Sequence, residues 1–261
     1  MTRSRRDREP VNLVPTLHLV IPFLNEFPTL ERAVRRVVDA PLPDGWNRRS
    51  ILVDDGSRPD AARLADALES EIEELVLLRH PHNRGKGAAV RTGFEYIAGS
   101  AAEEDVVGIQ DADLEYDPAD LGRLLDTLCR DGGDAIYGNR WTGPPTSLKA
   151  RIHRAGNRML TRFSNACTGF DLADMECCYK LLRMPTLRTI LPDLDENRFG
   201  IEPQITAALA RHGARVLEGP VSYKPRGFEE GKKIGLRDAF EAIKVMWRER
   251  RRTRQRRGAD V

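Results

Sequence analysis

The sequence predicts an α/β protein with a single main domain, in which helices flank a mostly parallel central sheet. Short apolar runs rich in β-branched residues alternate with segments whose apolar residues recur at helical spacing. Several of these runs end directly in acidic residues, proline or glycine, as strands do at the open edge of such a sheet. The chain has 261 residues, of which 40% are hydrophobic, so it is long enough for one large domain with a sizeable core.

The strands are expected to be short and the helices to lie between them. Apolar runs predict strands at 17–22, 50–57, 75–79, the first part of 106–118, 135–138 and 215–223. The first helix follows from Leu30, Ala33, Val34 and Val37 at helical spacing, with Pro28 in its first turn. Further helices are expected at 63–68, 88–97, 121–128, 149–167, near Pro185 and at 198–211. Strands that alternate with helices are typical of a parallel, doubly wound sheet.

The stretch 106–118 is central to the expected site, because an expected buried strand runs directly into acidic residues. Asp111, Asp113 and Glu115 occupy alternate positions, with Asp117 behind them. Carboxylates this close repel one another unless a positive group lies between them. Oxygen ligands suit Mg²⁺ or Mn²⁺, which usually also hold substrate phosphates. The alternative is an acidic turn that caps the helix beginning near Pro118.

Two other strand ends carry polar residues that the sheet would bring to the same edge. They are Asn25-Glu26 and the Asp54-Asp55-Gly56-Ser57 segment. Asp54 or Asp55 is suited to accept hydrogen bonds from a base or a ribose. Lys86 lies in a Gly-Lys-Gly turn at a helix start, where its backbone N–H and its ammonium are placed to contact a phosphate. The alternative for Lys86 is an ordinary turn lysine.

Charge is unevenly distributed although the formal net charge is only +2. Arginines crowd the first residues, and 248–257 is a dense basic tail. Such ends attract anionic lipid or nucleic acid, but no nucleic-acid recognition motif accompanies them, so no nucleic-acid partner is expected. The four cysteines lack metal-site spacing, no signal peptide is evident and no apolar stretch approaches a membrane span. These features predict a cytoplasmic protein, peripheral on the cytoplasmic face of the membrane.

Three parts of the chain are expected: a basic, flexible N-terminus at 1–14, a catalytic domain at 15–237, and an amphipathic helix with the basic tail at 238–261. The last helix carries one apolar stripe. Its members are Leu236, Ala239, Phe240, Ile243 and Trp247. This stripe either lies on an anionic membrane or packs on the catalytic domain.

Five segments match one family in order and spacing. They are 20–26, 52–57, 83–87, 110–115 and 137–140. As a set they resemble the family-2 glycosyltransferases, and within them the dolichol- and polyprenyl-phosphate mannose or glucose synthases. The resemblance covers roughly residues 17–237 and implies a nucleotide-binding fold of the glycosyltransferase-A type, with inversion at the anomeric carbon.

The resemblance also implies roles for residues that match the family's motifs. It places Pro22, Glu26 and Asp54 at the nucleoside, with Asp55 as a helper and Asp111 on the ribose and metal side; Asn25 and Lys86 lie at the same expected edge. Asp111, Asp113 and Glu115 become the metal ligands, Asp113 the principal one, for Mg²⁺ or Mn²⁺. Arg140 should approach the sugar or the acceptor phosphate. Arg226 and Lys232 or Lys233 match a basic loop that closes over diphosphate and acceptor.

The implied reaction is metal-dependent transfer of a hexose from a nucleotide sugar of the GDP-mannose or UDP-glucose type to a polyprenyl phosphate. A phosphate acceptor is already ionised near neutral pH and needs no protein base. A hydroxyl acceptor would need one, and Glu202 or Asp174 are the candidates. The alternative for Glu202 is a carboxylate placed to suit a helix dipole.

The sugar stays open because the segment 174–180 departs from the Gly-rich sequence of the mannose synthases. Two alternative functions also stay open. The first is transfer to a hydroxyl of a glycan or a small molecule. The second is a catalytically inactive nucleotide-sugar-binding protein, against which the intact Asp-x-Asp motif argues.

Overall fold

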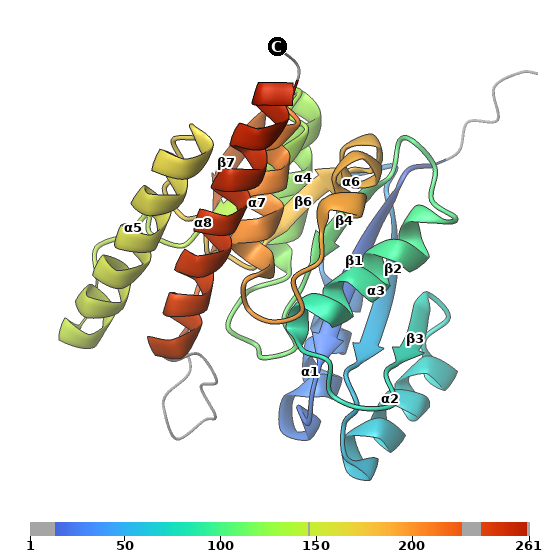
Figure 1. Ribbon diagram of the computed structural model, residues 1–261. Helices are drawn as coiled ribbons and strands as arrows, with labels where there is room; N and C mark the ends of the chain where they lie inside the picture. The colour runs from blue at the N-terminus through green and yellow to red at the C-terminus, as the bar shows by residue number, and fades with distance from the viewer. Residues whose placement is uncertain (1–13, 146, 226–235, 260–261) are drawn as a thin grey trace, which may run out of the picture.

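A seven-stranded sheet forms the centre of the computed structural model, which describes residues 14–145, 147–225 and 236–259, the last range with side chains for 240–253 (Figure 1). The strands are β1 (Thr16–Phe23), β2 (Asn47–Asp54), β3 (Leu75–Arg79), β4 (Val106–Ile109), β5 (Ala135–Asn139), β6 (Lys180–Arg183) and β7 (Val216–Pro220). The helices are α1 (Phe27–Asp39), α2 (Pro59–Glu71), α3 (Lys86–Ala98), α4 (Ala119–Asp131), α5 (Leu148–Thr168), α6 (Met184–Ile190), α7 (Ile201–Arg211) and α8 (Leu236–Ala259), with a short 3-10 turn at Leu191–Asp193.

The strand order is β3-β2-β1-β4-β6-β5-β7, and β6 alone among them runs antiparallel to its neighbours. The predicted α/β class and mostly parallel sheet are therefore confirmed. The sequence prediction missed β6, which carries the four residues Lys-Leu-Leu-Arg and leads directly into α6. A strand this short, buried on both faces, shows no alternation that would distinguish it from the helix that follows.

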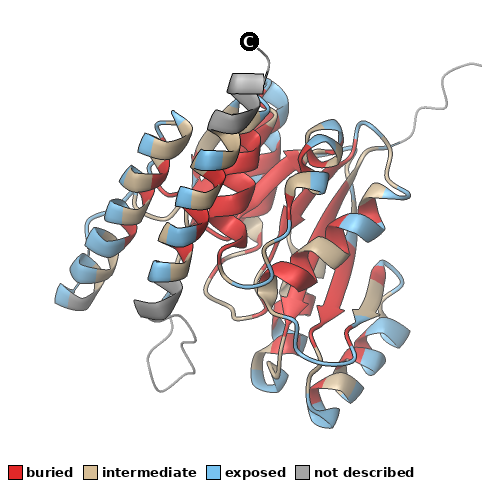
Figure 2. Ribbon diagram, in the orientation of Figure 1, coloured by how far each residue is buried: buried red, intermediate tan, exposed pale blue. Residues whose placement is uncertain are grey.

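The core lies on both faces of the sheet, as the uniformly buried central strands in Figure 2 show. In β1 every residue after Thr16 is buried, which fits a strand covered by helices on either side. The predicted inward face of α1 is confirmed, because Leu30, Ala33, Val34 and Val37 are its buried residues. On the other side of the molecule α5, α7 and α8 pack against one another, with α5 and α8 outermost (Figure 1).

The last helix packs on the domain, but not through the stripe that the sequence suggested. Its inward face carries Ala242, Val245 and Met246, all buried. Phe240 and Trp247 of the expected stripe are 69% and 49% exposed. The expectation that this stripe packs inward is wrong, because the smaller side chains fit against α7 and leave the larger ones outside.

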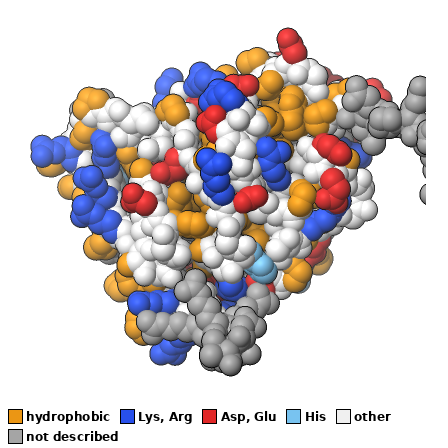
Figure 3. All heavy atoms as spheres, turned by 90° about the horizontal axis from the view of Figure 1, so that it is seen from above, with side chains coloured by type: hydrophobic (Ala, Val, Ile, Leu, Met, Phe, Trp, Pro, Cys, Tyr) orange, Lys and Arg blue, Asp and Glu red, His pale blue; other side chains and the backbone are white. Residues whose placement is uncertain are grey.

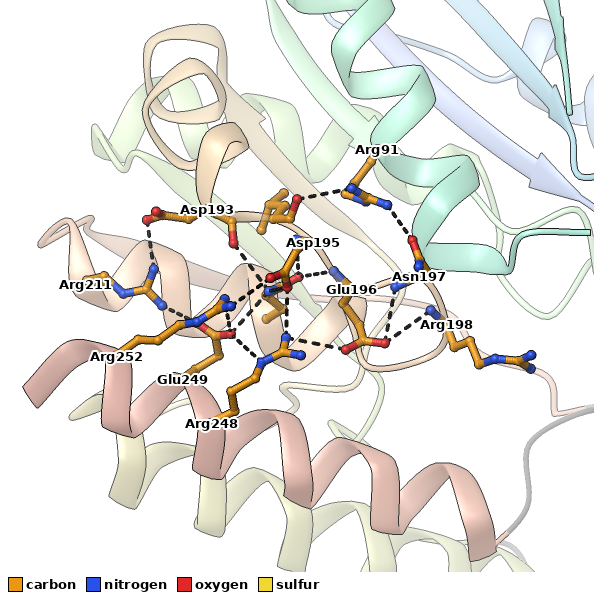
Figure 4. A network of polar contacts seen from close by, with 12 residues as sticks. Arg91, Asp193, Asp195, Glu196, Asn197, Arg198, Arg211, Arg248, Glu249 and Arg252 are labelled. Carbon is orange, nitrogen blue, oxygen red and sulfur yellow. Dashed lines mark hydrogen bonds and ion pairs between the residues drawn. The ribbon is translucent and has the colours of Figure 1, made fainter. Parts of the chain in front are cut away.

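The first residues of the expected basic tail are part of a polar network that fastens α8 to the protein (Figure 4). Asp195 accepts hydrogen bonds from Arg248, at 3.0 Å, and from Arg252, at 2.8 Å. Glu249 is fully buried and pairs with Arg211 of α7. These arginines therefore stabilise the attachment of α8 and are not simply a solvated tail.

Candidate active site

The polar strand ends predicted from the sequence lie at one edge of the sheet. β1, β2 and β4 are parallel neighbours, with Phe23 opposite Asp54 and Val20 opposite Ile109, so the loops that follow them adjoin. In two of these loops a residue other than glycine has a positive φ, 57° at Asn25 and 62° at Leu114. Such backbone conformations cost free energy and concentrate where a loop must hold a functional geometry.

Lys86 connects two carboxylates at this edge. Its ammonium nitrogen lies 2.9 Å from Asp111 Oδ1 and 2.8 Å from Glu202 Oε1. Burial alone would lower the pKa of Lys86, but the charges of Asp111 and Glu202 raise it well above its ordinary value. Burial alone would raise the pKa of Asp111, yet Lys86 lowers it below its ordinary value. The positive group that the clustered carboxylates require is thus in part a lysine of the chain itself.

Asp54 and Asp55 are almost fully buried and hold the surrounding loops in place. Asp55 accepts hydrogen bonds from the backbone N–H groups of Arg84 and Gly85, both at 2.8 Å, and lies 2.7 Å from Nδ1 of His80. Asp54 Oδ1 accepts a hydrogen bond from the Ser57 N–H at 2.8 Å. These contacts position the start of α3, and with it Lys86. Contact of Asp54 or Asp55 with a nucleotide stays a prediction.

The remaining predicted nucleotide residues lie at the end of β1. Pro22 is buried within the strand. Asn25 accepts a hydrogen bond from the Arg58 N–H at 2.8 Å and thereby joins the loops after β1 and β2. Glu26 precedes α1 and accepts a hydrogen bond from Thr29 Oγ1 at 3.2 Å. Their roles in binding a nucleotide stay predictions.

The Gly-Lys-Gly turn is packed closely against the loop before α7. A Cβ on Gly85, which has a φ of +101°, would lie 2.3 Å from the carbonyl oxygen of Asn197. A Cβ on Gly87 would lie 2.5 Å from the carbonyl oxygen of Glu196. Only glycine permits this approach, so the two glycines allow Lys86 to reach Glu202 on the neighbouring element.

In the acidic loop after β4, Asp113 and Glu115 accept hydrogen bonds from groups of the protein. Asp113 Oδ1 accepts a hydrogen bond from the Glu115 N–H at 3.0 Å, and Glu115 Oε2 accepts one from Tyr223 at 2.8 Å. Within the described ranges no three His, Cys, Asp or Glu side chains are grouped to hold a metal ion. The metal-ligand roles of Asp111, Asp113 and Glu115 stay predictions. Asp111 and Asp113 still fit a hard cation, since such ions commonly take one or two carboxylates together with substrate phosphates.

Arg140 and Asp174 form a buried ion pair. The guanidinium donates from Nε and from an NH2 group to the two oxygens of Asp174, each at 2.7 Å, and the Arg140 N–H adds a third hydrogen bond at 3.1 Å. The Asp174 side chain is fully buried. Both carboxylate oxygens of Asp174 are engaged by Arg140, which disfavours Asp174 as a base. Contact of Arg140 with a substrate phosphate stays a prediction.

An aromatic cluster beside Arg140 was not predicted from the sequence. The guanidinium lies 5.0 Å from the ring centroid of Trp141 and 5.1 Å from that of Tyr223. The ring of Tyr116 lies tilted against those of Tyr223 and Tyr179, with centroid distances of 5.3 Å and 4.8 Å. Because these aromatic residues come from distant segments, only the fold brings them together.

Glu176 is a second residue that the sequence analysis did not single out. Burial, and after it the charge of Glu202, raise the pKa of Glu176 to about 7. Among the described residues, Oε1 of Glu176 and Oε2 of Glu202 are buried without a hydrogen-bond partner. Lys180 donates to the carbonyl oxygens of Met175 and Cys177 and so holds this segment. The departure of 174–180 from the family's Gly-rich sequence was the available signal.

The predicted basic loop lies mostly outside the described residues. Arg226, Lys232 and Lys233 all fall in the range 226–235, which is not described. The segment just before them does meet the site, because the Lys224 N–H donates to the Glu115 carbonyl at 2.8 Å and Tyr223 forms a β-bridge with Tyr116.

The family model of the glycosyl transferase family 2 matches residues 18–191, a stretch that includes β1, β2, β4 and the acidic loop. The chain belongs to the glycosyl transferase family 2. It is therefore a family-2 glycosyltransferase, and the resemblance found in the sequence is confirmed.

Two relatives of this family-2 glycosyltransferase are similar to it over more than four fifths of its length. The undecaprenyl-phosphate 4-deoxy-4-formamido-L-arabinose transferase of Klebsiella pneumoniae (strain 342) is 28% identical over 220 residues, which are 84% of this chain and 63% of the relative. The undecaprenyl-phosphate mannosyltransferase of Micrococcus luteus is 29% identical over 221 residues, 83% of this chain and 86% of the relative. The chain thus spans less than two thirds of the length of the Klebsiella relative.

A solved structure establishes the fold type. Glucosyl-3-phosphoglycerate synthase from Mycobacterium tuberculosis, in complex with Mn²⁺, UDP and glucosyl-3-phosphoglycerate, matches with a TM-score of 0.61 at 19% identity, covering 95% of this chain and 86% of that chain. At this identity the likeness shows the fold alone, which is the glycosyltransferase-A type expected from the sequence.

Proposed function

We propose that this family-2 glycosyltransferase moves a hexose from a nucleotide sugar to a polyprenyl phosphate, with inversion at the anomeric carbon. One observation carries the choice of a phosphate acceptor. Both carboxylates suggested as bases are held by cations, Asp174 by Arg140 and Glu202 by Lys86. A phosphate is already ionised near neutral pH and needs neither of them. The names of the Klebsiella and Micrococcus relatives, which both state undecaprenyl phosphate, support the same choice.

Binding of the donor follows from the charges at the sheet edge. Asp111 and Asp113 would hold Mg²⁺ or Mn²⁺, which when bound supplies positive charge to the departing diphosphate. Lys86 keeps Asp111 ionised and fixed in position, since its ammonium contacts that carboxylate directly. The Mn²⁺ and UDP of the mycobacterial structure support a nucleotide donor and a divalent metal here. A GDP-mannose or a UDP-glucose type of donor fits this proposal equally.

The proposed acceptor side lies beside Arg140. The guanidinium is oriented by Asp174 and lies against Trp141 and Tyr223. Among the described residues the indole N–H of Trp141 is buried without a hydrogen-bond partner, which makes it a donor suited to a phosphate or sugar oxygen. Such donors hold an anion in line with the sugar without taking a proton from it. Contact of Arg226, Lys232 or Lys233 with this side stays a prediction.

A second candidate function rests on Glu176. A carboxyl with a pKa of about 7 is well matched to accept a proton from a hydroxyl near neutral pH. If the acceptor is a hydroxyl of a glycan or a small molecule, Glu176 then becomes the base in place of Glu202 or Asp174. The cytoplasmic location at the membrane face and the domain limits 15–237 and 238–261 stay predictions under either function.

The test is a transfer assay with the full chain and Mn²⁺. UDP-glucose and GDP-mannose are each offered with undecaprenyl phosphate, with the matching polyprenol, and with 3-phosphoglycerate as a soluble acceptor. Transfer to the lipid phosphate alone supports the proposal, and the anomer of the product, read by NMR, tests inversion. Transfer to the free alcohol at a similar rate, or to the soluble acceptor only, contradicts it. In that case loss of activity in Glu176→Gln would identify the base.

A further inference from the structure

Two helices on the outside of the molecule expose large apolar side chains. On α5, Leu148, Ile152 and Met159 are 70%, 67% and 63% exposed. On α8, Phe240 and Trp247 are exposed as well. These five make up most of the large apolar side chains that the described part of the chain exposes.

α5 exposes apolar residues that a helix on the surface of a soluble protein usually buries. Its fully buried residues are polar, namely Asn157, Thr161 and Ser164, while Leu160 and Phe163 are partly buried against the core. Ile152 and Met159 lie four and eleven positions beyond Leu148, close to one and three helical turns, so the three form one apolar stripe. All three are exposed, so this stripe faces outward. A helix at a water-facing surface normally has its apolar residues inside. The outer face of α5 is therefore suited to an apolar medium.

The exposed side chains of α8 lie on the helix that neighbours α5. Phe240 and Trp247 are seven residues apart and so lie on one stripe, two turns apart. α8 runs beside α5 in Figure 1, and Met246 and Arg250 of α8 line a common cavity with Cys167 of α5. The two stripes together with the exposed basic residues beside them are called the α5–α8 face.

The α5–α8 face is strongly basic. The sequence of α5 contains five Lys or Arg residues and no Asp or Glu. Arg151, Arg158 and Arg162 are exposed beside its apolar stripe, as are Lys244 and Arg251 on α8. In Figure 3 basic and hydrophobic side chains alternate along the left edge of the molecule, where α5 lies. Apolar residues bordered by arginines are the pattern of a helix that lies on an anionic lipid surface.

Charge decides between the occupants that could cover this face. A second copy of the chain would bring the same arginines together, and like charges repel. Nucleic acid would satisfy the arginines but leave Leu148, Ile152 and Met159 against a charged backbone. An anionic bilayer receives both, with apolar side chains at the acyl boundary and arginines at the lipid phosphates. Within the described residues no helix is long and apolar enough to span a membrane.

We propose that the α5–α8 face docks this protein on an anionic lipid bilayer. The face begins close to the acceptor side of the site, because Arg154 of α5 donates to the carbonyl oxygens of Trp141 and Gly143, both at 2.7 Å. If the polyprenyl chain stays in the bilayer, its phosphate then lies near the loop that follows Arg140, on the acceptor side of the site. This last step rests on the proposed function; the docking itself does not.

Flotation of the full chain with phosphatidylcholine vesicles, with and without phosphatidylglycerol, tests the docking. Wild type should float with the anionic vesicles and be released by salt. The pair Ile152→Ser with Met159→Ser, and the pair Arg158→Glu with Arg162→Glu, should each lower the partition coefficient at least about tenfold. Tyr96→Ser and Arg63→Glu are the matched controls, since both residues are exposed on other helices and should leave binding unchanged.

Ala155→Trp adds an aromatic ring to the exposed outer surface of α5 and should strengthen binding. Equal flotation of wild type and both paired variants overturns the proposal. Self-association that the variants abolish, without any vesicle binding by wild type, overturns it in favour of a second copy. Vesicle binding is measured without substrates, so it is independent of the proposed function. If wild type docks but transfers to no polyprenyl phosphate, the proposed function fails and the docking face stands.

Discussion

The ammonium of Lys86 lies between Asp111 and Glu202, 2.9 Å and 2.8 Å from their nearest oxygens. The three residues come from the start of α3, the loop after β4 and the start of α7. Glu202 lies in the first turn of α7, as the helix-dipole interpretation expected, but the lysine is the stronger partner. The ion pairs therefore join three elements across the site.

Lys86→Met should destabilise the protein, because it leaves two carboxylates close together without a cation. Removing one partner of a buried ion pair costs about 3 to 5 kcal/mol, and partial exposure of Asp111 should reduce this to about 2 to 4 kcal/mol. Urea unfolding measures the difference. The double variant Lys86→Met with Glu202→Gln removes one of the uncompensated charges and should recover part of the loss. No recovery would contradict the ion-pair account.

Asp113→Ala should remove nearly all transferase activity, and EDTA should do the same to wild type. A metal that stabilises the leaving diphosphate contributes several kcal/mol, which is roughly a thousandfold in rate. The assay follows transfer against Mn²⁺ concentration. Asp126→Ala, at an exposed carboxylate that pairs with Arg130 on α4, is the control and should be as active as wild type. Full activity of Asp113→Ala in EDTA would falsify metal dependence.

Asp174→Asn separates a structural carboxylate from a catalytic base. Because the Asp174 side chain is fully buried and bound on both oxygens by Arg140, we expect a loss of about 3 kcal/mol in unfolding free energy. The variant should lose activity in parallel with its stability, as measured by thermal melts and by transfer at low temperature. A variant of wild-type stability with no turnover would instead identify Asp174 as a base.

Glu176 should make stability depend on pH. Burial and the charge of Glu202 raise its folded-state pKa to about 7, whereas an unfolded glutamate has a pKa of about 4.3. The folded protein holds this proton more tightly, so the stabilising contribution is fully present below about pH 4 and is lost as the pH rises through about 7.

Glu176→Gln removes this titration, so the unfolding free energy of the variant should fall less than that of wild type between about pH 5 and about pH 7. The difference cannot exceed the equivalent of the full pKa shift, which is about 4 kcal/mol. Guanidinium unfolding at a series of pH values measures it. Parallel pH profiles for the two proteins would show that Glu176 is ionised in the fold.

Most of the fold could be predicted from local patterns. The helices have apolar residues at helical spacing, the strands are short apolar runs, and several strands end in acidic residues, proline or glycine. β6 did not, since four buried residues show no period. The sequence predicted an apolar stripe on α8, but it did not show whether that stripe faces the domain or the outside. The chain offers two apolar stripes on that helix, and only the fit of Ala242, Val245 and Met246 against α7 decides which turns inward.

The site was predictable where a single loop carries it and not where distant segments meet. Asp111 and Asp113 are two residues apart in the sequence, and their place at a strand end follows from the parallel sheet. The contact of Lys86 with Glu202 joins residues far apart in the chain, and no pattern in either segment predicts it. Glu176 is similar, because its raised pKa comes chiefly from burial and from the charge of Glu202 on a distant helix.

The attachment of α8 has a consequence for how the protein is made. Arg248 and Arg252 hold Asp195, and two residues further on Asn197 O accepts the Ala88 N–H at 3.0 Å beside the Gly85–Gly87 turn. The strands that the structure describes are complete by Pro220, but this clamp needs a helix that begins at Leu236. A chain still emerging from the ribosome therefore has its sheet before the loop that supports Lys86 is fixed. We expect donor binding to appear only once α8 has been made, so a chain that stops before α8 would consume no nucleotide sugar.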